Sequence, residues 1–170
     1  MFCMAIWLSG SVFISVVATQ NFYTIDRLID KSPNDVFRVV VETMENPQAR
    51  DLLRYLSSEL NRLYFQYWNL AQLPVGIIAL RLVSSIPKSR LATWGIVAML
   101  CVVLFLMVFI TPPILSIGRG LDFVPRIPPP PELRTFGLLH AAYSALTVVN
   151  VVLGVLVTLW LQKEHPSQDS

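Results

Sequence analysis

The chain contains apolar stretches that are too long and too poor in charge to be the buried helices of a water-soluble domain. Three of them, at about 2–19, 91–110 and 136–161, contain no Asp, Glu, Lys or Arg, and a fourth at about 64–85 contains one arginine. A hydrocarbon core about 30 Å thick is crossed by a helix of about 20 residues that rises about 1.5 Å per residue. The pattern therefore predicts four membrane-spanning helices.

Composition agrees with this interpretation. Of the 170 residues, 54% are hydrophobic and only 14% are charged, whereas a soluble domain has about 25% charged residues. Four spans with short connections predict a single all-α membrane domain over residues 1–170, an antiparallel four-helix bundle with both termini on one side. No Lys or Arg precedes the first stretch, so we expect it to be kept as a helix and not removed as a signal peptide.

The polar segment at 20–63 is predicted to be helical. Ser32 is placed to cap a short helix, with Pro33 in its first position and an end near Glu45. A second start follows at Asn46–Pro47, and no breaker separates it from the second span. We therefore expect one long helix from about Pro47 to Ser85.

The first third of this long helix is predicted to be an amphipathic extension outside the bilayer. Its apolar stripe consists of Ala49, Leu52, Leu53, Leu56, Leu60 and Leu63. The opposite face carries Arg50, Asp51, Arg54, Ser58 and Arg62. We expect the apolar stripe to be covered by the membrane surface, by the short helix after Ser32 or by a partner.

The third span is expected to end at Thr111-Pro112-Pro113, and a proline-rich loop follows at 111–135. Four consecutive prolines at 128–131 favour an extended, stiff backbone. The last helix is predicted to begin at Pro131-Glu132, and the polar tail from Gln162 to Ser170 is expected to fray.

The distribution of Lys and Arg predicts an orientation. One side of the bilayer would hold nine of the 13 basic residues, namely Arg27, Lys31, Arg38, Arg50, Arg54, Arg62, Arg119, Arg126 and Arg134. The other side would hold Arg81, Lys88, Arg90 and Lys163. The positive-inside rule then places both termini outside the cytoplasm. We expect a multi-pass protein of the cell membrane, in a bacterium the inner membrane.

The fourth span carries a series of polar and small residues at helical spacing. They are His140, Tyr143, Ser144, Thr147, Asn150 and Gly154. Lipid offers these groups no hydrogen-bond partner, so the face that they share is expected to turn toward the other helices. One interpretation is hydrogen bonding between helices; the other is a proton, metal or substrate path centred on His140.

The other spans carry fewer polar side chains. Gln66, Asn69 and Gln72 in the second span are expected to face the polar side of the fourth span, and the arginine Arg81 to extend its charge to the interface. In the first span, Ser11, Ser15 and Thr19 beside Gly10 predict close helix packing. Three tryptophans near span ends favour an interfacial aromatic belt, namely Trp7, Trp94 and Trp160.

No catalytic, metal or cofactor motif is recognisable. The spans contain one histidine and no carboxylate, whereas a bis-histidine haem needs two histidines, and ion-coupled transport favours an acidic group. A net charge of +2 gives no reason to expect a nucleic-acid partner. The sequence favours a non-enzymatic protein without cofactor, a subunit or scaffold whose partners are the bilayer and other membrane subunits or copies of itself. A metal or haem protein using His140 and a small transporter or resistance factor stay open.

Short motifs in three spans resemble the transmembrane-protein-205-like domain, a four-helix membrane family. The motifs are Ala5-Ile6-Trp7-Leu8-Ser9-Gly10-Ser11-Val12-Phe13 in the first span, Tyr64-Phe65 before the second, and Phe136, Leu139-His140, Ser144 and Asn150 in the last. The charged segment between the first two spans is longer than that family leads us to expect. The resemblance implies a four-helix layout without enzymatic activity, and it draws attention to His140, Ser144 and Asn150.

Overall fold

The structure is a computed structural model that describes residues 1–44, 46–87 and 89–164, and its secondary structure within these ranges is entirely helical. The elements are α1 (Phe2–Lys31), α2 (Asp35–Thr43), α3 (Asn46–Ser84), α4 (Arg90–Phe105), the π-helical turn η1 (Leu106–Ile110), α5 (Thr111–Gly120) and α6 (Glu132–Glu164). Three helical segments of the described chain are long and apolar enough to cross a membrane, namely Phe2–Lys31, Arg90–Gly120 and Glu132–Lys163. Glu45, Lys88 and most of the predicted frayed tail, with His165, lie outside the described residues.

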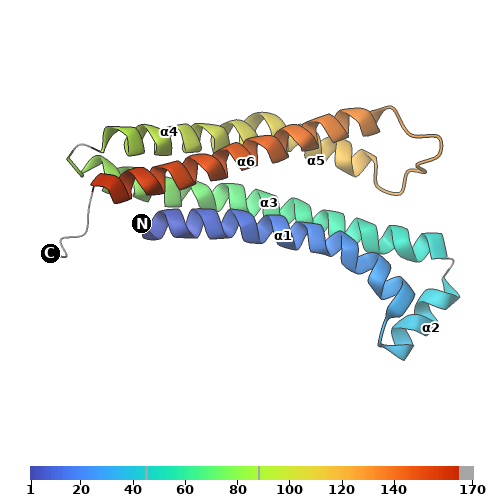
Figure 1. Ribbon diagram of the computed structural model, residues 1–170. Coiled ribbons are helices and arrows are strands. Elements are labelled where there is room, and N and C mark those ends of the chain that lie inside the picture. Colours follow the sequence, from blue (N-terminus) through green and yellow to red (C-terminus); the bar gives the residue numbers. More distant parts are fainter. Residues whose placement is uncertain (45, 88, 165–170) are drawn as a thin grey trace.

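The long helices lie side by side (Figure 1). Helix α1 packs along α3, α4 packs along α6, and further contacts join α3 to α4 and α1 to α6. Helix α1 begins and α6 ends at the same end of the molecule, while α2 and the proline-rich loop lie at the other end (Figure 1).

Helix α1 extends well beyond the predicted span at 2–19. It continues to Lys31 because residues 20–31 contain no proline or glycine, and Ile25 of this segment is buried. Ser32 then has an extended backbone, with φ −62° and ψ 131°, as expected for a residue that precedes proline.

The predicted cap of α2 is wrong by two residues. The backbone N–H of Phe37 donates to Oδ1 of Asn34 at 2.9 Å, so Asn34, and not Ser32, is the N-cap. Ser32 instead accepts a hydrogen bond from the backbone N–H of Asn34 at 3.3 Å. Asp35 is then the first helical residue, and Pro33 lies before the helix.

Helix α3 is continuous from Asn46 to Ser84, including Pro74, and so has nearly the length that the sequence predicts. The predicted apolar stripe on its first third is only partly covered. Ala49 is 3% exposed, but Leu52 and Leu56 are 50% and 55% exposed. Helix α1 instead covers a polar strip of α3 around Asn61, which is 8% exposed. Neither α1 nor α2 therefore fully covers Leu52 and Leu56.

The expectation that the third span ends at Thr111-Pro112-Pro113 is also wrong. The helix widens into the π-helical turn η1, and α5 then begins with the two prolines in its first positions. A proline in a regular α-helix crowds the carbonyl four residues earlier, and a π turn relaxes that spacing. The helical segment therefore continues to Gly120, and the loop begins about ten residues later than predicted.

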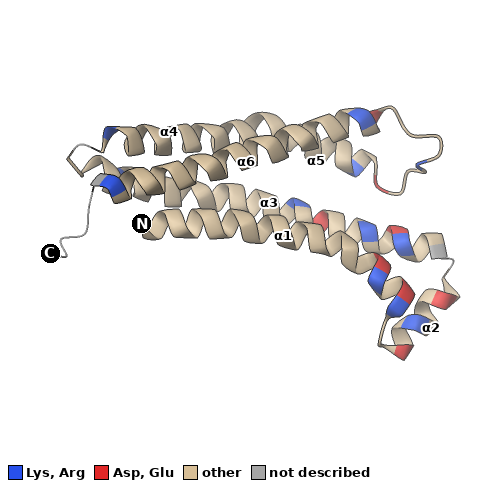
Figure 2. Ribbon diagram, in the orientation of Figure 1, with Lys and Arg blue, Asp and Glu red and all other residues tan. Residues whose placement is uncertain are grey.

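The interior is apolar at one end of the molecule and polar in the middle. The apolar core consists of Met4, Trp7, Ala79, Val83, Ala92, Ile96, Met99, Val103, Val157 and Leu161. Charged residues gather at the two ends of the helices, most of them at the end that carries α2 and the proline-rich loop (Figure 2). We call that end the charged end.

Candidate functional site

A buried polar network lies in the middle of the molecule, where α3, α5 and α6 meet. The Tyr143 hydroxyl donates to Oδ1 of Asn69 at 2.9 Å, and Nδ2 of Asn69 donates to Oγ1 of Thr111 at 3.4 Å. Their exposed fractions are only 8%, 2% and 9%. The predicted contact between amides of the second span and the polar side of the fourth span is therefore confirmed at Asn69 and Tyr143.

Beside this network, Trp68 joins α3 to α1 by a separate hydrogen bond. Its indole Nε1 donates to Oγ of Ser11 at 3.2 Å, and its carbonyl accepts a 3.4 Å bond from Nε2 of Gln72. The Trp68 ring lies against Gly10 so closely that a Cβ added there would collide with it. The predicted close packing of the first span thus occurs at Gly10 and Ser11, whereas Ser15 is exposed.

Asn150 of α6 contributes an acceptor that no described residue satisfies. Its Nδ2 donates to the carbonyl of Met99 at 3.4 Å, but its Oδ1 is buried without a partner in the described chain. Asn150 lines a cavity of ≈ 10 Å³, whose walls also include Ser11, Ser15, Phe65, Trp68, Asn69, Gln72, Tyr143 and Thr147. That volume is about the space that one water molecule needs.

The remaining predicted site residues lie outside this network. Gln66 is half-buried and does not line the cavity, and Arg81 is exposed near the end of α3. Ser144 is exposed, so its predicted inward orientation is wrong. At about 100° per residue, Ser144 lies to one side of the helix face that Tyr143 and the other inward residues form. His140 is also exposed, but it lines a pocket between α3, α5 and α6 together with Tyr143.

His140 has an aromatic neighbour and no set of metal ligands. Its ring stacks on Phe136, with ring centroids 6.0 Å apart, and its carbonyl accepts a 2.9 Å hydrogen bond from the Ser144 hydroxyl. Among the described residues, no group of three or more His, Cys, Asp or Glu side chains could hold a metal ion.

The prediction that Trp7 belongs to an interfacial aromatic belt is wrong. Trp7 is 0% exposed in the apolar core, where its indole N–H has no hydrogen-bond partner in the described chain. Trp94, in contrast, is 69% exposed. Helix α1 starts alongside the ends of α3 and α6, so its first turns are surrounded by other helices (Figure 1).

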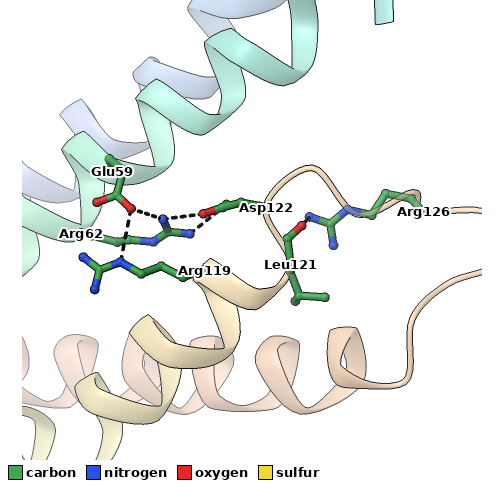
Figure 3. Close-up of polar contacts among 6 residues, drawn as sticks. All are labelled: Glu59, Arg62, Arg119, Leu121, Asp122 and Arg126. Atoms are coloured by element: carbon green, nitrogen blue, oxygen red, sulfur yellow. Dashed lines mark hydrogen bonds and ion pairs between the residues drawn. The ribbon is translucent and has the colours of Figure 1, made fainter. Parts of the chain in front are cut away.

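An ion-pair cluster holds α3 to the end of α5 (Figure 3). The Arg62 guanidinium donates to both carboxylate oxygens of Asp122 at 2.8 and 3.0 Å, and to Oε1 of Glu59 at 2.6 Å. The Arg62 and Asp122 side chains are only 10% and 14% exposed. Burial alone lowers the pKa of Arg62, but hydrogen bonds to Asp122 and Glu59 raise it overall, so Arg62 stays charged.

Arg119 extends the cluster toward solvent. Its Nε lies 3.3 Å from Oε1 of Glu59, and its side chain is 59% exposed. Hydrogen bonds from Arg119 and then Arg62 hold the pKa of Glu59 below its ordinary value of 4.5. The described cluster therefore pairs two arginines with two carboxylates across α3, α5 and the loop (Figure 3).

A pocket of ≈ 120 Å³ separates the ion-pair cluster from the buried network. Arg62 borders it at the charged end and Tyr143 borders it on the side of the network, while Phe22, Phe65 and Phe136 supply apolar walls. The site as a whole thus passes from paired charges, through aromatic side chains, to neutral hydrogen-bonding groups.

Sequence reasoning missed both the partners of Arg62 and the polar strip between α1 and α3. The helical pattern places Arg62 on the solvent face, and nothing local marks Asp122, 60 residues away, as its partner. The polar strip could have been predicted from the sequence, because polar and tryptophan side chains recur there at helical spacing, namely Ser57, Asn61, Trp68 and Gln72. Asn61 Nδ2 donates to the carbonyl of Ala18 at 2.9 Å, which joins the two helices.

Comparisons with known proteins add no relative. No family model matches the sequence, and neither the curated proteins nor the solved structures give a match. The resemblance to the transmembrane-protein-205-like domain stays a prediction.

Proposed function

We propose that this chain is a non-enzymatic, multi-pass membrane protein that serves as a subunit or scaffold of a larger membrane complex. The observation that carries the membrane assignment is the reversed polarity of its middle section. Asn69, Gln72 and Asn150 are buried there, while Phe13 and Phe109 are 65% and 63% exposed. A protein surrounded by water has the opposite distribution. Lipid favours this one, because lipid solvates the exposed apolar side chains and the polar groups pair with one another inside the bundle.

We propose α3 as a fourth crossing, which completes an antiparallel four-helix bundle with α1, α4–α5 and α6. Between Arg62 and Arg81, α3 has 18 residues without a formal charge, about 27 Å of helix. Its amides lower the apolar character of this segment, yet they face the other helices, while Leu70 and Ile77 are 57% and 55% exposed.

The charge distribution supports an orientation. The charged end holds most of the basic residues and the opposite end holds few (Figure 2). The positive-inside rule then favours a cytoplasmic charged end, with both termini on the other side of the cell membrane.

The role as a subunit is supported by exposed leucines in the extension of α3. If Arg62 marks the edge of the hydrocarbon, Leu56 and Leu52 lie about 9 and 15 Å beyond it along the helix. They are 55% and 50% exposed, and the described part of the chain leaves them uncovered. A partner subunit that contacts these leucines would remove this apolar surface from water.

Site-directed cysteine labelling tests the membrane assignment. In a background without Cys3 and Cys101, single cysteines at Asp35 and Pro87 are treated with a membrane-impermeant thiol reagent on intact cells. We expect Pro87→Cys to react from outside and Asp35→Cys only after the cells are opened. Recovery of the protein in the soluble fraction without detergent would contradict the assignment, and the reverse labelling pattern would contradict only the orientation.

Crosslinking tests the subunit role. A photoreactive amino acid at Leu56 is expected to crosslink to the same polypeptide that co-purifies in mild detergent, and Leu52→Ala is expected to weaken that crosslink. Leu70, which is 57% exposed on the proposed membrane-spanning part of α3, provides the matched control position. A monomer that gives no crosslink at Leu56 would rule the role out.

Neither rival hypothesis has a specific observation in its favour. A metal or haem site at His140 lacks a cluster of ligands among the described residues. A transport path through the bundle would need more room than the ≈ 10 Å³ cavity at Asn150 offers.

A further inference from the structure

Helices α1 and α6 enclose an open groove on the outer surface of the middle section. It has a volume of ≈ 440 Å³ and mostly apolar walls, which include Val12 and Val16 of α1 and Val148 and Val152 of α6. These four valines are 54%, 52%, 62% and 52% exposed. In a bilayer the groove would open sideways into the hydrocarbon.

The groove adjoins the polar cavity of the buried network. Ser11, Ser15 and Thr147 line both spaces, so the inner wall of the groove is also a wall of the cavity. An apolar molecule lying in the groove would therefore have its nearest polar contact at these side chains, and Asn150 lines the same cavity as they do.

The chemistry of the cavity selects one kind of polar group. Asn150 is 4% exposed, and its Oδ1 lacks a donor among the described residues, so it needs an O–H or N–H group to complete its hydrogen bonding. None of the cavity-lining residues is Asp, Glu, Lys or Arg. A carboxylate or phosphate would be buried there without a counter-charge, which is costly. A neutral hydroxyl fits the available volume, which is about that of one water.

We propose that the α1–α6 groove binds a membrane-dissolved molecule that has an apolar chain and a neutral hydroxyl, and that this hydroxyl donates to Oδ1 of Asn150. The proposal rests on the membrane assignment given above. Asn150 lies 18 residues after the start of α6 and 14 before its end, near the middle of the membrane-spanning segment. Lipids with charged headgroups do not reach this depth, whereas neutral apolar alcohols do.

Photolabelling of the purified protein in detergent micelles tests the proposal. The probe is a long-chain alcohol that carries a diazirine on its chain, and mass spectrometry locates the labelled residues. We expect the probe to label Val16 and Val152. Excess 1-dodecanol should abolish this labelling, whereas dodecanoate at the same concentration and pH 8 should not change it. Equal competition by both compounds, or no preference for the groove, would overturn the proposal and indicate that the cavity holds only water.

Two variants separate the hydroxyl site from general lipid contact. Asn150→Leu removes the acceptor while keeping a side chain of similar volume. We expect it to lower groove labelling about fivefold, because one hydrogen bond to the probe is lost. Ser15→Phe fills the inner wall that the groove shares with the cavity and is expected to reduce labelling as strongly. Thr158→Val is the control, because the Thr158 hydroxyl donates to the carbonyl of Gly154 on its own helix and lines neither the groove nor the cavity.

Labelling of Val155 and Leu159, which are 44% and 52% exposed on α6, distinguishes the two proposals. If these residues are labelled but groove labelling survives both Asn150→Leu and Ser15→Phe, the hydroxyl site is wrong and the membrane assignment stands. If the probe labels none of the exposed apolar residues, the membrane assignment itself fails.

Discussion

The middle section and the charged end both bury polar side chains, but they do so with different chemistry. In the middle section the buried groups are neutral, and each makes one or two hydrogen bonds, as Asn69 does with Tyr143 and Thr111. At the charged end Arg62 makes three charge-assisted bonds to Asp122 and Glu59. Ionised groups are tolerated where water is near, whereas under the proposed membrane assignment the middle section admits only groups that cost little to desolvate.

The comparison predicts that the charged end is more sensitive to loss of one side chain. Arg62→Ala leaves Asp122, 14% exposed, without its bidentate partner. We expect a loss of about 3 kcal/mol in unfolding free energy, measured by denaturant unfolding in detergent. The control is Arg38→Ala, whose pair with Asp35 is 56% and 81% exposed, and which should cost less than about 1 kcal/mol. Equal effects of the two variants would remove the distinction between buried and exposed ion pairs.

Close packing in the middle section is tested at Gly10. Gly10→Ala forces the Trp68 ring to move, and we expect it to cost about 2 kcal/mol and to disturb the bond from Trp68 to Ser11. Trp68 fluorescence and thermal unfolding in detergent measure both effects. At Gly137 a Cβ meets nothing within 4 Å, so Gly137→Ala should be neutral or stabilising. A harmless Gly10→Ala would show that α1 and α3 pack less tightly than the structure indicates.

A smaller effect is expected for the neutral network itself. Tyr143→Phe removes the donor to Asn69 and should cost about 1 kcal/mol in unfolding free energy. Ser144→Ala is a control on the same helix, because its exposed hydroxyl bonds to the carbonyl of His140. A cost for Tyr143→Phe as large as that for Arg62→Ala would contradict the contrast between the two regions.

The smallest expected effect is a dependence of stability on pH at the charged end. The pKa of Glu59 is lowered in the folded protein by hydrogen bonds from Arg119 and then Arg62, so the folded state binds a proton less tightly than the unfolded state. Its stabilising contribution is therefore complete above the ordinary pKa of 4.5 and is lost as pH falls through the lowered value. We expect Glu59→Gln to reduce the dependence of the thermal unfolding midpoint on pH below about pH 5. An unchanged profile would show that Glu59 does not contribute.

Local signals were sufficient for several elements. The Pro131-Glu132 start of α6 and the continuity of α3 follow from capping residues, proline positions and the absence of breakers. The ends of α1 and of the third apolar segment differ from the prediction, because a change in polarity does not by itself end a helix and because prolines fit the first turn of α5. The helix continued to Lys31 in one case and through η1 into α5 in the other.

The sequence by itself determined that this protein is helical, where its apolar segments lie, and which polar residues share a helix face, because all three depend on spacing along one chain. Only the tertiary structure decided that Tyr143 and Asn150 face inward while Ser144 does not, and that Arg62 meets Asp122. The physical reason is that spacing defines a helix face relative to its own axis. How far that axis is rotated, and what lies opposite, depends on the packing of neighbouring helices, such as the approach of Trp68 to Gly10.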